Sequence, residues 1–88
     1  MNHYHRKILH SLFAHPINAN ISMKDVEHVL SEMGGEISQA KSGKIHVLLN
    51  GHSSNFSHHS LSLPKVEVVQ MRKFITNCRI NPLADYPV

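Results

Sequence analysis

Apolar residues recur at helical spacing in the first part of the chain. Tyr4, Ile8 and Leu12 follow one another at intervals of four residues, which predicts a helix over 4–14. His15-Pro16 is expected to end it, because the residue before a proline is driven out of the helical region. The sequence leaves two roles open for this helix. Its apolar residues either extend a small core or form a homodimer contact (Ile8, Leu12 and Phe13).

Two further helices are predicted on either side of a central polar region. Ser22 is a residue type that caps helix N-termini, and Asp25 follows three positions later. The apolar positions that follow form one stripe: Val26, Val29, Leu30 and Met33. Gly34-Gly35 supplies the stop, since glycine takes the left-handed conformation at low cost. Pro64 suits the first turn of a closing helix, whose apolar face is Val68, Met71, Phe74, Ile75 and Cys78.

Between these helices the period changes from helical spacing to two. Along 44–50 (KIHVLLN), Ile45, Val47 and Leu49 point one way, and Lys44, His46 and Leu48 the other. A first strand is predicted over 36–41, and Asn50-Gly51 is a strong hairpin signal before a third strand over 52–58. The predicted order is α-α-β-β-β-α. The chain is therefore expected to be a single small α+β domain, in which helices cover one face of a three-stranded antiparallel meander.

The amino-acid composition indicates which partners the protein can bind and in which cellular compartment it is expected. Nine Lys and Arg against six Asp and Glu give a formal charge of +3, which favours polyanions, and nine histidines add charge as the pH falls. Apolar runs too short for a bilayer, and the lack of a secretory segment after Met1, predict a cytoplasmic protein with no membrane partner. Cys78 stands alone on an apolar helical face, which indicates a buried thiol and no intramolecular disulfide.

Several kinds of chemistry are not supported by any motif. His3-x-His5 and His58-His59 are the close histidine pairs, and neither a Cys-x-x-Cys nor a His-Glu-x-x-His spacing occurs, so neither a metal nor a cofactor is expected. A Gly-x-Ser-x-Gly elbow and glycine-rich phosphate loops are missing too. The absence of Trp and the scarcity of Tyr and Phe argue against a base-stacking platform for single strands.

Three stretches of the chain resemble the HicA family of toxins from bacterial toxin–antitoxin systems. They are 22–36 (SMKDVEHVLSEMGGE), 37–51 (ISQAKSGKIHVLLNG) and 63–80 (LPKVEVVQMRKFITNCRI). They look like the family's first helix with its glycine turn, its first two strands and its closing helix. On this resemblance, 21–80 is the HicA-like domain and 1–20 an added helix with its connector. The segment 81–88 contains Pro82 and Pro87 and is predicted to be a flexible tail. The resemblance implies a fold like that of double-stranded-RNA-binding domains, cleavage of mRNA, and neutralisation by a HicB-type antitoxin.

The family motif at the start of the second strand is Gly-Ser-His, in which the histidine is catalytic. This chain has Ser42-Gly43-Lys44 there, so Lys44 occupies the histidine position, and His46 lies about 6–7 Å further along the same strand face. Two functions therefore stay open. The overall pattern favours an mRNA endoribonuclease, whereas the substitution favours a non-catalytic RNA-binding or protein-interaction domain on the same fold.

The candidate site residues lie on the strands and their turns. His46 can exchange a proton near neutral pH, and Lys44 can hold a phosphate as a point charge, which makes them the candidate catalytic pair. A basic patch around them could follow an RNA backbone through its phosphates: Lys41, Lys44, His52, His58 and His59. The alternative is that these residues form an ordinary solvated surface.

Overall fold

The computed structural model describes residues 1–17, 20–39, 43–57 and 62–88. In chain order its elements are α1 (His3–Ser11), α2 (Met23–Glu32), β1 (Glu36–Gln39), β2 (Lys44–Leu49), β3 (His52–Ser57), α3 (Lys65–Asn77) and α4 (Pro82–Asp85). The predicted α+β class and the order α-α-β-β-β-α are confirmed, and α4 is an addition. None of the helices in these ranges has the length and apolar character that crossing a bilayer requires.

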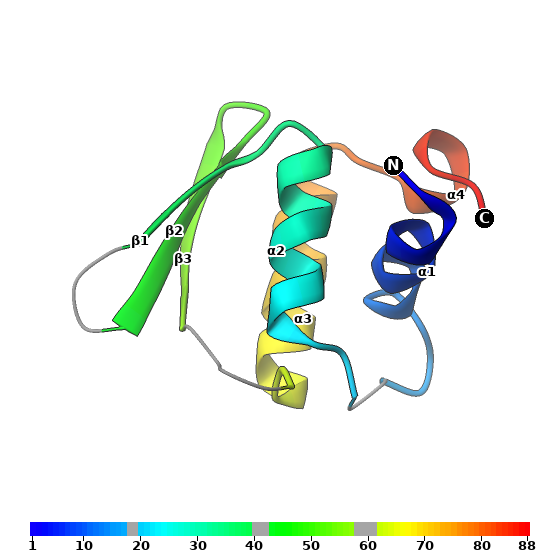
Figure 1. Cartoon of the computed structure of the whole chain (residues 1–88), viewed down its shortest axis with the longest axis horizontal. Coiled ribbons are helices and arrows are strands. Elements are labelled where there is room, and N and C mark those ends of the chain that lie inside the picture. Colours follow the sequence, from blue (N-terminus) through cyan, green and yellow to red (C-terminus); the bar gives the residue numbers. More distant parts are fainter. Residues whose placement is uncertain (18–19, 40–42, 58–61) are drawn as a thin grey trace.

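The three strands form an antiparallel sheet in the order β1-β2-β3, as the predicted meander requires. Figure 1 shows three layers: the sheet, then α2 beside α3, then α1 with α4 on the far side of these helices. Helix α2 contacts β1, α3 contacts β3, and α1 contacts α2. All the described helices therefore lie on one side of the sheet, and none of the described elements covers its other face.

The core lies between the sheet and the middle pair of helices. The alternation along β2 sends Ile45, Val47 and Leu49 toward the helices, where each is at most 1% exposed. They meet the apolar stripes that the sequence predicted on α2 and α3, and these stripes are buried as well: Val26, Val29, Leu30 and Met33 on α2, and Val68, Met71, Phe74 and Ile75 on α3. Burial of this kind is the main driving force for folding.

The β2–β3 hairpin has the tight turn that its sequence predicted. Asn50 and Gly51 both have positive φ, 51° and 80°, as a two-residue turn of the primed type requires. The Asn50 side-chain amide donates to the carbonyl of Cys78 at 2.9 Å, which ties the turn to the end of α3. Cys78 is 2% exposed, so the predicted buried thiol is confirmed. Burial raises the pKa of this thiol.

Helix α1 extends the core, one of the two roles that the sequence left open for it. Leu9 and Leu12 are fully buried, and Ile8 and Phe13 pack partly buried against the same cluster. The helix ends at Ser11, before the predicted boundary. From α3, the guanidinium of Arg72 donates to the carbonyl oxygen of Leu12 through Nε at 2.8 Å and to that of Ala14 through Nη2 at 3.1 Å. These bonds give partners to carbonyls at the C-terminal end of the helix.

The C-terminal residues 81–88, for which the sequence predicted a flexible tail, contain the short helix α4. The Asn81 side-chain oxygen caps it by accepting from the amide of Leu83 at 3.0 Å, and Asp85 accepts from the amide of Asn81 at 2.8 Å. The segment also docks on α1, because His10 Nε2 donates to the carbonyl of Tyr86 at 2.7 Å. Long-range contacts to α1 thus hold a segment whose own sequence carries little helix signal.

Candidate functional site

The open face of the sheet gathers most of the polar strand residues. On β2 it carries Lys44, His46 and Leu48, which alternate with the buried residues of that strand. Direct cross-strand partners share a face. The open face is therefore defined by these three residues with their partners on β1 and β3: Glu36, Ser38, Ser53, Asn55 and Ser57.

The centre of the open face is a bonded pair. His46 pairs with Asn55 across β2 and β3, and His46 Nδ1 lies 2.8 Å from Asn55 Oδ1. An amide oxygen can only accept, so the ring proton lies on Nδ1 and the neutral ring keeps a lone pair on Nε2. His46 is half-buried, which limits its rotation further. The arrangement can present Nε2 as a general base to a ligand on this face.

A cation lies beside this base on the same strand. Lys44 is exposed, precedes His46 by two residues and pairs with Ser57 on β3. Its Cα is therefore about 6–7 Å from that of His46 on the same face. Glu36 is the one acidic residue of the open face as defined, and it pairs with Leu48, at the other end from Lys44. The Lys44 end thus offers a cation, a base and hydroxyl groups to an anionic ligand.

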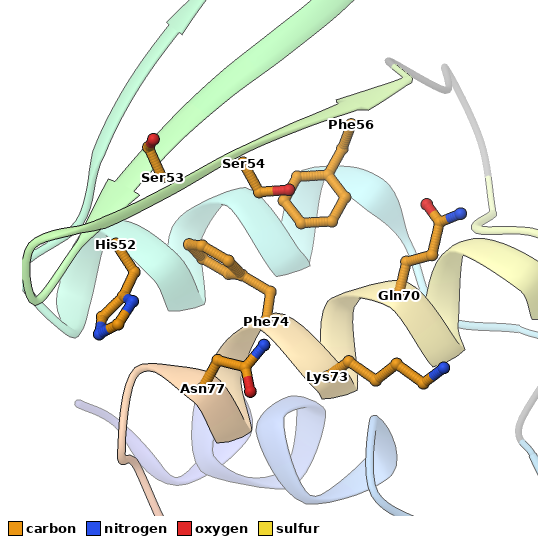
Figure 2. A pocket seen from close by; sticks show the side chains of 8 residues that line it. All are labelled: His52, Ser53, Ser54, Phe56, Gln70, Lys73, Phe74 and Asn77. Carbon is orange, nitrogen blue, oxygen red and sulfur yellow. The ribbon is translucent and has the colours of Figure 1, made fainter.

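The structure does not bring all the predicted RNA-binding residues together. His52 pairs with Leu49 at the hairpin end of the sheet, and its side chain lines a pocket on the helix side, as Figure 2 shows. It is about 17 Å along the strand from the Lys44 end, at five residues of strand rise. Lys41, His58 and His59 lie outside the described residues. Lys44 and His46 are the predicted site residues that share the open face.

Asn55 was missed by the sequence reasoning, although a signal for it exists. A two-residue turn at Asn50-Gly51 makes Leu49 and His52 partners, and counting outward from them pairs His46 with Asn55. The hairpin signal therefore fixes the residue opposite His46. An amide at that place, within reach of a ring nitrogen, could have been predicted from the register alone.

A second group of titratable side chains lies between α1 and α2. Tyr4 donates to Asp25 Oδ2 at 2.6 Å, and His5 Nδ1 lies 2.7 Å from Glu32 Oε2. The hydrogen bond to Asp25 is the main cause that raises the pKa of Tyr4, with smaller contributions from burial and the carboxylate charge. Each of these groups joins the two helices, so the cluster holds α1 in place. Among the described residues, no group of three or more His, Cys, Asp and Glu could hold a metal ion.

No family model matches this chain, and neither a curated protein nor a solved structure matches it.

Proposed function

We propose that this protein is a HicA-like, RNA-targeting toxin of the mRNA endoribonuclease type, which acts in the cytoplasm and is neutralised by a HicB-type antitoxin. The observation that carries the proposal is the geometry of the open face. His46 is held through Nδ1 by Asn55 at 2.8 Å and can offer Nε2, and Lys44 lies two residues away on the same face. A base and a cation at this spacing suit attack on a phosphodiester.

The proposed reaction is cleavage by the RNA's own 2′-hydroxyl group. Nε2 of His46 takes the 2′-hydroxyl proton, and the 2′-oxygen attacks the adjacent phosphorus. The bond from phosphorus to the 5′-oxygen breaks, which leaves a 2′,3′-cyclic phosphate and a 5′-hydroxyl. The leaving oxygen takes its proton from the imidazolium of His46 or from water. The Lys44 ammonium stabilises the charge that develops on the non-bridging oxygens.

Asn55 has a positioning role in this proposal. Its side-chain oxygen fixes the tautomer in which the ring proton lies on Nδ1, so that Nε2 is the basic nitrogen. In the family pattern the histidine stands where Lys44 stands here. The base is therefore displaced by two residues along one face, and the bound phosphate must lie correspondingly further along β2.

The alternative is a non-catalytic RNA-binding or protein-interaction domain on the same fold, which the lysine at the motif position favours. Phosphate contact by Lys44 is common to both RNA functions. In the binding alternative, His46 and Asn55 form only a polar pair on a solvated strand face.

Induction of variants in bacteria separates these functions. The wild type is expected to arrest growth and degrade mRNA, His46→Ala to do neither, and Lys44→Ala to act more weakly. His52→Ala is the matched control, because this histidine of the same sheet lies on the helix side. Immunoblots and thermal unfolding of the purified variants check level and fold. A harmless wild type with intact mRNA refutes the enzyme.

RNA affinity tests the binding alternative in the same set of proteins. The salt dependence of duplex-RNA binding by the wild type reports the number of phosphates contacted, and Lys44→Ala is expected to reduce the slope of log K against log salt by about one. A flat salt response in the wild type rules out binding through phosphates.

A further inference from the structure

Strand β3 is an edge of the sheet, and no other described strand pairs with its outer side. In an antiparallel hairpin with a two-residue turn, the closing pair Leu49–His52 exchanges both backbone hydrogen bonds, and such pairs then alternate along the ladder. Every second residue of β3 therefore directs its N–H and C=O away from β2. These outward residues are Ser53, Asn55 and Ser57.

The sequence of β3 carries none of the usual protections against strand pairing. Edge strands are commonly blunted by charged side chains, especially lysine, or by proline. β3 reads HSSNFS, with no proline and no Lys, Arg, Asp or Glu. Its six residues are long enough to template a further strand of ordinary length.

A pocket opens beneath the same edge, between β3 and α3. Its volume is about 340 Å³, and Figure 2 shows the lining side chains coming from both elements. Phe56 and Phe74 form its apolar part as an edge-to-face pair with ring centroids 5.5 Å apart. The pocket therefore lies where alternate side chains of a strand added to β3 would point.

The basic side chains of the pocket indicate that its partner is acidic. Lys73 and His52 line it, with the amides of Gln70 and Asn77, and none of the described lining residues is Asp or Glu. Lys73 is exposed. A carboxylate is the complementary group, and apolar neighbours of that carboxylate would meet the phenyl rings.

We infer that the β3 edge binds an extended, acidic segment of a partner protein by strand addition. The segment's backbone pairs with the outward groups of Ser53, Asn55 and Ser57. Every second side chain enters the pocket, where a carboxylate meets Lys73. This is a known mode of peptide recognition, in which main-chain bonds give affinity and pockets give specificity. The pocket lies on the helix side of the sheet, and the edge pairs through backbone groups alone. The inference therefore does not depend on RNA cleavage by the side chains of the open face.

A second copy of this chain fits the edge less well. Pairing two β3 edges would bring two copies of the basic pocket together, each in a chain of formal charge +3. Like charges placed opposite one another disfavour association. The occupant is therefore taken to be acidic and different from this chain.

The test uses two blocked peptides, Val-Thr-Glu-Thr-Val-Thr and the same peptide with Lys in place of Glu, added to the full chain. Amide hydrogen exchange followed by NMR should show new protection at Ser53, Asn55 and Ser57, and little change at His52 and Ser54, which already face β2. The acidic peptide is expected to bind about threefold to tenfold more tightly than the basic one, as one solvent-facing ion pair gained or lost implies.

Charge reversal supplies the matched variants. Lys73→Glu is expected to reverse the preference between the two peptides, while Lys65→Glu, the same change on the same helix outside the pocket lining, leaves it unchanged. Equal binding of both peptides, or protection without the alternate pattern, overturns the inference. If the same three amides become protected without peptide when the protein concentration is raised, the edge pairs with a second copy of this chain. That result also overturns the inference. Lys73→Glu should leave RNA cleavage unchanged, so the two proposals fail separately.

Discussion

Replacement of Arg72 by methionine tests how much the contact between α1 and α3 stabilises the domain. Methionine keeps an unbranched apolar stem and removes the guanidinium. Two hydrogen bonds from α3 are lost, one to the carbonyl of Leu12 at 2.8 Å and one to that of Ala14 at 3.1 Å. The first bond is partly buried, whereas water can replace the second at the exposed Ala14.

The expected loss follows from these two environments. A hydrogen bond with a charged donor contributes about 1.5–3 kcal/mol when its acceptor is left without a partner, and a cation at a helix C-terminus adds a few tenths. With the exposed bond counted as negligible, Arg72→Met should lower the free energy of unfolding by about 2 kcal/mol. For a domain of this size that is a fall of about 8–16 °C in the melting temperature.

The assay is thermal unfolding followed by circular dichroism, with Lys73→Met as control. Lys73 is the next residue of α3 and is exposed, and its replacement by methionine removes one positive charge, as Arg72→Met does. Its replacement should change stability by less than about 0.5 kcal/mol. Equal melting temperatures for the two variants would refute the role of Arg72 in holding α1.

Three further predictions concern the glycine turn, the thiol and the contact between α1 and α2. A Cβ added at Gly35 would lie 2.8 Å from the Leu30 carbonyl oxygen, so Gly35→Ala should cost about 1–3 kcal/mol in chemical denaturation. Because Cys78 is buried and its pKa is raised, it should react with a thiol reagent much more slowly in the native protein than in urea. The pKa of Tyr4 is raised above 10.0, chiefly by its bond to Asp25, so this bond stabilises the fold below pH 10.0 and the stabilisation is lost as the pH rises through the folded-state pKa. In alkaline denaturation, Tyr4→Phe should therefore lose less stability than the wild type over that range.

The fold could be predicted where local signals were strong. Alternation in β2, the Asn50-Gly51 turn and the apolar stripes of α2 and α3 are each written within a few neighbouring residues. The position at which α1 ends and the helical structure within residues 81–88 could not be predicted in this way. They depend on Arg72 reaching Leu12 and His10 reaching Tyr86, contacts between residues 60 and 76 positions apart in the chain.

The arrangement of the candidate site could be predicted in part for the same reason. Lys44 and His46 share a face because a strand has a period of two, and the sequence shows this directly. The sequence grouped His52 with them by proximity to a turn. His52 and Phe56 are four residues apart on one strand and therefore lie on the same face. Because Phe56 is buried, this face is the helix side. The bond from Asn55 to His46 required the register, which the hairpin turn supplies.

The central claim is that the open face cleaves RNA with His46 as the base, and cleavage by the purified protein tests it most directly. An end-labelled RNA is incubated with the wild type, His46→Ala and the control His52→Ala, after circular dichroism has shown equal folding. We expect products ending in a 2′,3′-cyclic phosphate from the wild type and from His52→Ala, and none from His46→Ala. Cleavage by His46→Ala at the wild-type rate, or no cleavage by a folded wild type, contradicts the claim.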